Sequence, residues 1–87
     1  MIRILLVDDH PVVRAGLRAL VDGQDDLTVI GEADGLDAAL AAVQRERPDV
    51  VLMDLSLGAE AVGGAEVTAR LRQLPEPPEV LVLTTYD

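Results

Sequence analysis

Ile4-Leu5-Leu6-Val7-Asp8-Asp9 is the stretch that decides the fold: an uninterrupted apolar run that ends in two carboxylates. A second run of the same kind, Val50-Val51-Leu52-Met53, ends in Asp54. Continuous apolar runs, as opposed to alternating ones, are typical of strands that are covered on both faces, as in parallel sheets. Both runs therefore predict strands of a parallel sheet, each with an acidic carboxyl end.

Strand and helix patterns alternate along the rest of the chain. Residues 27–30 and 80–83 predict two further strands, the first of them at an edge of the sheet. Pro11 suits the first position of a helix that ends at Gly23, and Asp34 is the predicted N-cap of a second helix. Apolar residues recur at helical spacing in three segments: Val13, Leu17, Leu20 and Val21; Leu36, Leu40 and Val43; Val67, Leu71 and Leu74. The order is β-α-β-α-β-α-β.

This order predicts an α/β fold: an open parallel sheet with right-handed crossovers and helices on both faces. Ligands of such sheets bind at the carboxyl ends of the strands, where Asp8, Asp9 and Asp54 lie. The three meet in space if their strands are neighbours, which the apolar pattern alone does not establish. Two carboxylates about 5 Å apart repel by roughly 3 kcal/mol at an effective dielectric constant of about 20. A hard divalent cation with oxygen ligands offsets that cost.

Composition narrows the functions open to the chain. It contains no cysteine, which excludes disulfides and thiolate metal sites, and Tyr86 is its one aromatic residue, so the core is aliphatic. The formal charge of −9 repels phosphate backbones and the arginines are scattered, so we expect no direct nucleic-acid binding by this chain. No signal peptide and no apolar run of membrane-spanning length are present, which favours a cytoplasmic location and no membrane partner.

Three motifs taken together resemble the receiver domain of two-component response regulators. They are the turn Asp8-Asp9-His10-Pro11 and the strand ends at residues 51–55 and 82–85. The first helix, from residue 11 to 17, is similar to the nitrate/nitrite-regulator-like subgroup, in which the receiver precedes a LuxR-type helix-turn-helix DNA-binding domain. The resemblance implies a flavodoxin-like, doubly wound sheet with strand order 2-1-3-4, followed in complete receivers by a fifth strand. It also implies a role in phosphorelay signalling and transcription regulation.

The resemblance implies a role for each site residue. Asp54 matches the aspartate that accepts a phosphoryl group from a sensor histidine kinase or a small phosphodonor. Asp8 and Asp9 match the acidic pair that holds Mg²⁺ together with Asp54 and the backbone carbonyl of Ser56. Thr84 matches the switch hydroxyl that hydrogen-bonds the phosphoryl group.

Simpler interpretations of some of these residues stay open beside the functional ones. One of Asp8 and Asp9 could serve as the N-cap of the first helix, although capping needs one carboxylate and the pattern supplies two. Thr84 also suits an ordinary strand position. His10 is predicted to be an exposed turn residue. Ser56 and Tyr86 fall at two positions that in the family influence the lifetime of the phosphoryl group.

Two departures from the family pattern stand out. The loop over residues 57–64 lacks the usual proline and is longer than usual, and the chain contains no lysine, whereas a receiver pairs the phosphoryl group with a lysine on its fifth strand. By this comparison residues 1–87 are the N-terminal part of one receiver domain, without the fourth helix, the fifth strand, the fifth helix and any DNA-binding domain. The uncovered edge strand at residues 80–83 then predicts self-association, unless these residues are part of a longer protein.

Three functions are compatible with these residues. The first is a phosphoryl-accepting signalling receiver, not an enzyme beyond its own phosphorylation and dephosphorylation. The second is a Mg²⁺-dependent phosphohydrolase with an aspartyl-phosphate intermediate, a chemistry that usually places a second acid where Ser56 stands. The third is an interaction or dimerisation module that keeps the fold but is not phosphorylated, which the missing lysine favours.

Overall fold

The computed structural model describes residues 1–54 and 64–83, and all the predicted strands and helices are present in it. They are β1 (Ile2–Val7), α1 (Pro11–Asp22), β2 (Leu27–Ala33), α2 (Leu36–Glu46), β3 (Val50–Asp54), α3 (Gly64–Arg72) and β4 (Glu79–Leu83). Almost all of the loop over residues 57–64 lies outside the described residues.

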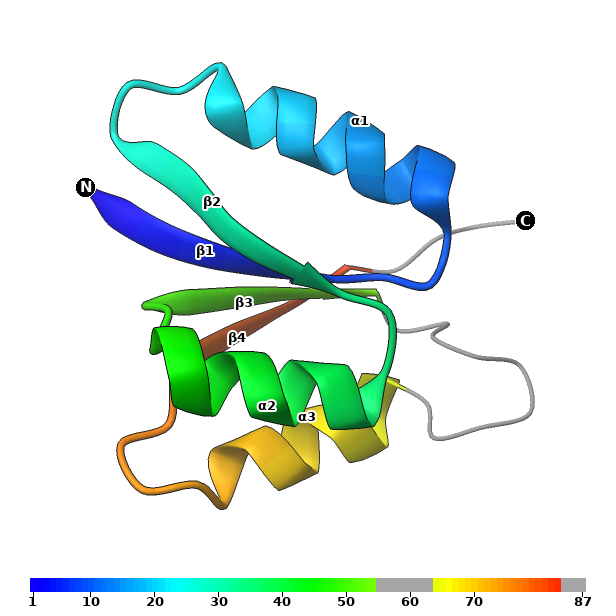
Figure 1. The fold of residues 1–87 in the computed structure, drawn as a ribbon, viewed down its shortest axis with the longest axis vertical. Coiled ribbons are helices and arrows are strands. Elements are labelled where there is room, and N and C mark those ends of the chain that lie inside the picture. Colours follow the sequence, from blue (N-terminus) through cyan, green and yellow to red (C-terminus); the bar gives the residue numbers. More distant parts are fainter. Residues whose placement is uncertain (55–63, 84–87) are drawn as a thin grey trace.

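The strands form one parallel sheet in the order β2-β1-β3-β4. Helix α1 covers one face, and α2 and α3 cover the other (Figure 1). The predicted doubly wound α/β fold and its strand order are therefore confirmed. Strand β1 lies directly beside β3, with Val7 opposite Met53, so the condition for bringing the acidic strand ends together is met.

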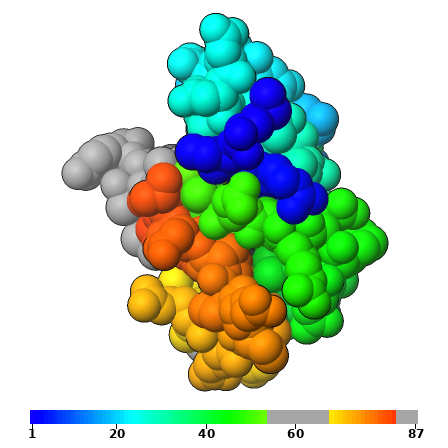
Figure 2. All heavy atoms as spheres, turned by 90° about the vertical axis from the view of Figure 1, so that its left-hand side faces the viewer, coloured from blue at the N-terminus to red at the C-terminus, as the bar shows by residue number. Residues whose placement is uncertain are grey.

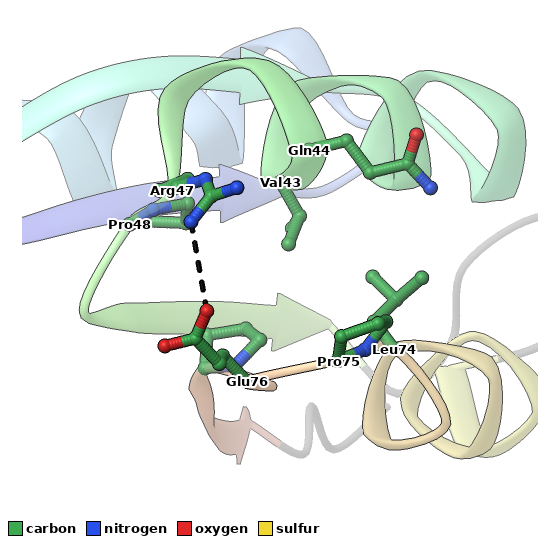
Figure 3. Close-up of a pocket in the computed structure, with 8 residues that line it drawn as sticks. Val43, Gln44, Arg47, Pro48, Leu74, Pro75 and Glu76 are labelled. Atoms are coloured by element: carbon green, nitrogen blue, oxygen red, sulfur yellow. Dashed lines mark ion pairs between the residues drawn. The ribbon is translucent and has the colours of Figure 1, made fainter.

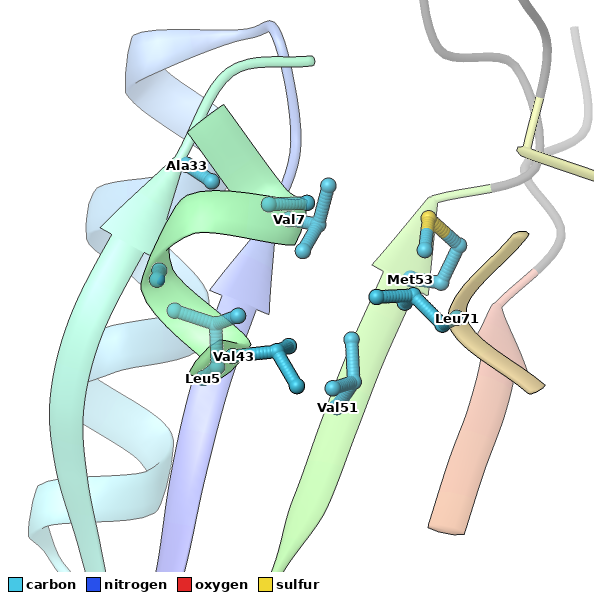
Figure 4. Close-up of a cluster of buried hydrophobic side chains, with 9 residues drawn as sticks. Leu5, Val7, Ala33, Val43, Val51, Met53 and Leu71 are labelled. Atoms are coloured by element: carbon cyan, nitrogen blue, oxygen red, sulfur yellow. The ribbon is translucent and has the colours of Figure 1, made fainter. Parts of the chain in front are cut away.

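The core consists of two apolar layers, one on each face of the sheet. Leu5 and Val7 point to the α2 side, where they join a cluster with Val51, Met53 and Leu71 (Figure 4). The alternate residues of β1, Ile4 and Leu6, point to the α1 side. There they pack with Val21 of α1 and Val29 of β2. Because β1 is covered on both faces, its apolar run has no polar interruptions.

Two details of the helices differ from the sequence prediction. Leu20 is 69% exposed, because α1 meets the sheet through Leu17 and Val21, one turn apart, and leaves the flank between them in solvent. The predicted N-cap Asp34 is wrong: α2 begins after Gly35, whose carbonyl accepts the first helical hydrogen bond, and no side chain caps this end. Asp37 lies in the first turn instead, where its charge interacts favourably with the helix dipole.

The amino ends of the strands are held together by Arg3. Its guanidinium donates hydrogen bonds to the last carbonyls of α2, at 2.7 Å to Glu46 and 2.8 Å to Arg47. Its backbone N–H donates to the Asp49 carboxylate at 2.8 Å, and its carbonyl accepts from the Asp49 N–H at 2.8 Å. Figure 2 views the molecule from this end, where the blue start of the chain lies against the green segment that follows α2.

Strand β4 is the outer strand of the described sheet on the side away from β2. Two of its apolar side chains are exposed, Leu81 at 57% and Val82 at 42%. Among the described residues, none of the helices has the length and apolar character needed to cross a membrane.

Candidate functional site

The turn that joins β1 to α1, Asp8-Asp9-His10, is the acidic turn, and its first residue is fixed on both sides of its backbone. The N–H of Asp8 donates to the Ala33 carbonyl at 3.0 Å, and the Asp8 carbonyl accepts from Nη1 of Arg14 at 2.7 Å. The Asp8 side chain is 1% exposed. The carboxylate at the end of β1 is therefore buried and held in one place.

The two oxygens of the Asp8 carboxylate differ in their partners. Oδ1 accepts the backbone N–H of His10 at 2.7 Å. Oδ2 is buried and has no hydrogen-bond partner among the described residues. Because a buried charge without a partner is costly, this oxygen is suited to bind a cation.

Asp9 and His10 complete a group of side chains with the composition of a cation site. One ligand atom from each residue of the acidic turn lies within 4.8 Å of the other two. Nδ1 of His10 is 2.9 Å from Oδ1 of Asp9 and 3.4 Å from Oδ1 of Asp8. His10 is the N-cap residue of α1, without a side-chain capping bond, and its side chain is 57% exposed. His10 is thus an exposed turn residue as predicted, and neither aspartate takes the N-cap position.

The backbone of Asp54 reaches the same edge of the sheet as the acidic turn. Asp54 is the last residue of β3, directly after Met53, which pairs with Val7. It lies opposite Leu83, the last residue of β4. The side chain of Asp54 lies outside what the structure describes. The other predicted site residues, Ser56, Thr84 and Tyr86, lie outside the described ranges as well.

Two arginines of α1 connect this edge to β2, and no sequence pattern predicted these contacts. Arg14 donates to Oε1 of Glu32 through Nε at 2.7 Å, while Arg18 hydrogen-bonds the other oxygen of the same carboxylate. The hydrogen bond from Arg18, supported by Arg14 and opposed by partial burial, lowers the pKa of Glu32 below its ordinary value. Glu32 is therefore a stable anion between two cations.

A separate cavity of about 450 Å³ lies at the opposite end of the sheet, beside the last turn of α2 (Figure 3). Its walls combine the end of α2 with the segment after α3: Val43, Gln44, Arg47, Pro48, Leu74, Pro75, Glu76 and Pro78. Arg47 and Glu76 form an ion pair at 3.7 Å, and both are exposed. This cavity has no cluster of acids, so the acidic turn remains the candidate site.

The fold is that of doubly wound α/β proteins, which bind their ligands at the carboxyl ends of the strands, and here that edge carries acidic residues. Residues 4–87 match the response regulator receiver domain, and the chain belongs to that family. Receiver domains of response regulators are regulatory. The predicted family is therefore confirmed.

The individual relatives are transcriptional regulatory proteins. The chain is 45% identical over 87 residues to the transcriptional regulatory protein LiaR of Bacillus subtilis, covering 99% of this chain and 40% of that protein. It is 39% identical over 88 residues to BtsR of Salmonella typhi, covering 100% of this chain and 35% of that protein. The chain thus spans about 40% or less of the length of these relatives.

Solved structures agree with this assignment. A LuxR-family two-component response regulator from Aurantimonas sp. SI85-9A1 superimposes with a TM-score of 0.90 at 37% identity, covering 100% of this chain and 61% of that one. The receiver domain of the response regulator NarL from Mycobacterium tuberculosis gives a TM-score of 0.85 at 34% identity, covering 99% and 68%. The likeness to the nitrate/nitrite-regulator-like subgroup is confirmed by these two structures.

Proposed function

We propose that this chain is the phosphoryl-accepting part of a bacterial two-component transcriptional response regulator, and that it works with Mg²⁺ at the acidic edge of the sheet. The observation that supports this most is the unpartnered Oδ2 of the buried Asp8 carboxylate, at the edge where Asp54 ends β3. Carboxylate oxygens are ligands that hard cations take, and no hydrogen bond from the described residues competes for this one. Residues 1–87 then make up the N-terminal part of a receiver domain.

Each site residue has a defined task in this proposal. Asp8 and Asp9 would hold the cation, with Asp54 and the carbonyl of Ser56 as further ligands. Mg²⁺, when bound, would neutralise negative charge on the phosphoryl oxygens. Thr84 would hydrogen-bond a phosphoryl oxygen once Asp54 carries the group, which changes the conformation around that strand end.

The chemical step is a transfer between two nucleophiles. One carboxylate oxygen of Asp54 forms a bond to phosphorus while the bond from phosphorus to the imidazole nitrogen of a histidine kinase breaks, and the electron pair stays on that nitrogen. With acetyl phosphate as donor, the leaving group is acetate. Asp8 keeps its place during the step because its backbone N–H and carbonyl are both hydrogen-bonded.

The partners follow from the same assignment. We infer a cytoplasmic sensor-kinase domain as the phosphodonor and a cytoplasmic location for the chain itself. The charge of −9 supports the absence of direct nucleic-acid binding by these residues. The exposed Leu81 and Val82 on an edge strand support self-association through β4. Light scattering of the purified protein tests this last point, and a monomer at all concentrations contradicts it.

The decisive test is phosphorylation with Mg²⁺ and acetyl phosphate, followed by measurement of the intact mass. We expect the mass to rise by one phosphoryl group in the unmodified protein and in the control Asp49→Asn, whose carboxylate lies at the opposite end of the sheet. Asp54→Asn should show no gain. A folded protein that never gains mass would favour the unphosphorylated interaction module, and turnover of a phosphate ester without an adduct would favour the phosphohydrolase.

A further inference from the structure

A line of hydrogen bonds runs from β2 through α1 to the acidic turn. Glu32 of β2 accepts a hydrogen bond from Nε of Arg14 in α1 at 2.7 Å, and a second guanidinium nitrogen, Nη1, donates to the Asp8 carbonyl at 2.7 Å. The side chains of Arg14 and Glu32 are 22% and 28% exposed. The hydrogen bond to the Asp8 carbonyl is partly buried, whereas the one to Glu32 is open to solvent. One guanidinium thus joins the second strand to the backbone of a proposed cation ligand.

Glu32 faces α1 only because β2 contains an irregularity. Ile4 pairs with Val29 but Leu5 pairs with Gly31, so Ile30 is an extra residue in β2. Side chains alternate between the faces of a strand, and one extra residue reverses the alternation beyond it. Val29 accordingly packs on the α1 side whereas Ala33, four residues later, packs on the α2 side. If side chains alternated regularly from Val29 through Ile30 to Glu32, Glu32 would face α2, away from Arg14.

The hydrogen bond to the Asp8 carbonyl fixes the peptide plane between Asp8 and Asp9. In a trans peptide the carbonyl and the following N–H are held in one plane, so the direction of the Asp8 carbonyl sets the direction in which the chain enters Asp9. The hydrogen bond from Arg14 therefore restrains the direction in which the backbone enters Asp9.

We propose that Arg14, held by Glu32, is a positioning residue that sets the affinity of the acidic turn for its divalent cation. The inference rests on the proposed function, because it concerns the same cation. Partners in the outer shell of metal sites typically change metal affinity by about 10-fold to 100-fold when they are removed.

Whether Mg²⁺ binding weakens or strengthens when Arg14 is replaced distinguishes a positioning role from simple charge repulsion. Arg14 carries a positive charge close to the proposed site, so charge repulsion alone predicts that its removal strengthens Mg²⁺ binding. Positioning predicts the opposite, because the turn loses the bond that orients it. The variant Arg14→Met removes the charge and keeps much of the apolar stem, and Arg14→Lys keeps the charge but loses the two-pronged bond.

The experiment measures the dissociation constant of Mg²⁺ by isothermal titration calorimetry, with MgCl₂ alone as the probe. We expect binding to weaken by about tenfold in both Arg14→Met and Arg14→Lys. Glu32→Gln, which weakens the hydrogen bond that supports Arg14 without changing any residue of α1, should also weaken Mg²⁺ binding. If circular dichroism shows that Arg14→Met does not fold, Glu32→Gln and Arg14→Lys together test the inference.

Arg18→Gln is the matched control. Arg18 hydrogen-bonds the same carboxylate of Glu32 and lies near Asp22, but among the described residues no hydrogen bond runs from it to the acidic turn. Its removal should change the dissociation constant by less than about twofold. Equal or tighter Mg²⁺ binding in both Arg14 variants would overturn the inference. Absence of binding in the unmodified protein would instead overturn the proposed function.

Discussion

The two ends of the sheet use similar residues in opposite ways. At the amino end, the Asp49 carboxylate accepts a hydrogen bond from the Arg3 backbone, and the Arg3 guanidinium satisfies the last carbonyls of α2. At the carboxyl end, Asp8 is more deeply buried, yet one of its oxygens has no hydrogen-bond partner among the described residues. The hydrogen bonds at the amino end stabilise the fold. At the carboxyl end the buried Oδ2 of Asp8 costs stability, and it is available as a ligand atom. Substitutions that exchange these properties test the comparison.

The largest effect is expected from Asp8→Asn. The amide keeps an acceptor for the His10 N–H but removes the buried charge, so the metal-free protein should become more stable by about 1 kcal/mol. Mg²⁺ binding should weaken by at least about tenfold, because a charged ligand is lost. Urea unfolding in the presence of EDTA measures the first quantity, and calorimetric titration with MgCl₂ measures the second.

Asp49→Asn is the control at the other end. It weakens a charge-assisted hydrogen bond to the Arg3 N–H, so stability should fall while Mg²⁺ affinity stays the same. If Asp8→Asn were instead the less stable of the two in EDTA, the proposed contrast between the ends would be wrong.

A smaller effect is expected from Arg3→Met, which removes the guanidinium but keeps a long side chain. Two carbonyls at the end of α2 lose their donors, and the free energy of unfolding should fall by about 1–2 kcal/mol. Mg²⁺ affinity should not change. Arg45→Met is the matched control, because among the described residues the one interaction of the Arg45 side chain is an exposed pair with its neighbour Glu46, which contributes little. Similar losses in both variants, measured by urea unfolding, would contradict the role given to Arg3.

The features that the sequence predicted correctly depend on local patterns. The apolar run of β1 predicted a strand covered on both faces, and Pro11 and Gly23 predicted the two ends of α1. The meeting of Asp8 with the Asp54 strand end needed one further fact, that β1 and β3 are neighbours. The family resemblance supplied that fact, and the pairing of Val7 with Met53 confirms it.

The features that the sequence did not predict depend on register. Glu32 reaches Arg14 because Ile30 is an extra residue in β2. Gly31 is the one local sign of it, and a glycine there fits the end of a strand as well as a bulge. The exposure of Leu20 likewise depends on which flank of α1 the sheet covers. Both are properties of how elements pack against each other, whereas apolar periodicity describes one element at a time.

The smallest expected effect is the pH dependence of the stability that Glu32 contributes near the carboxyl end of the sheet. The hydrogen bond from Arg18, with the help of Arg14, lowers the pKa of Glu32 below its ordinary value near 4.5. A carboxyl whose pKa is lower in the folded state adds stability above its unfolded pKa, and that stability is lost as the pH falls through the folded pKa. The unmodified protein should therefore be more stable than Glu32→Gln near neutral pH, and the difference should shrink as the pH falls below about 4.5. Thermal unfolding of both proteins in EDTA at a series of pH values measures the difference. A gap that stays constant into the acid range would show that the ionised Glu32 carboxylate does not hold α1 against β2.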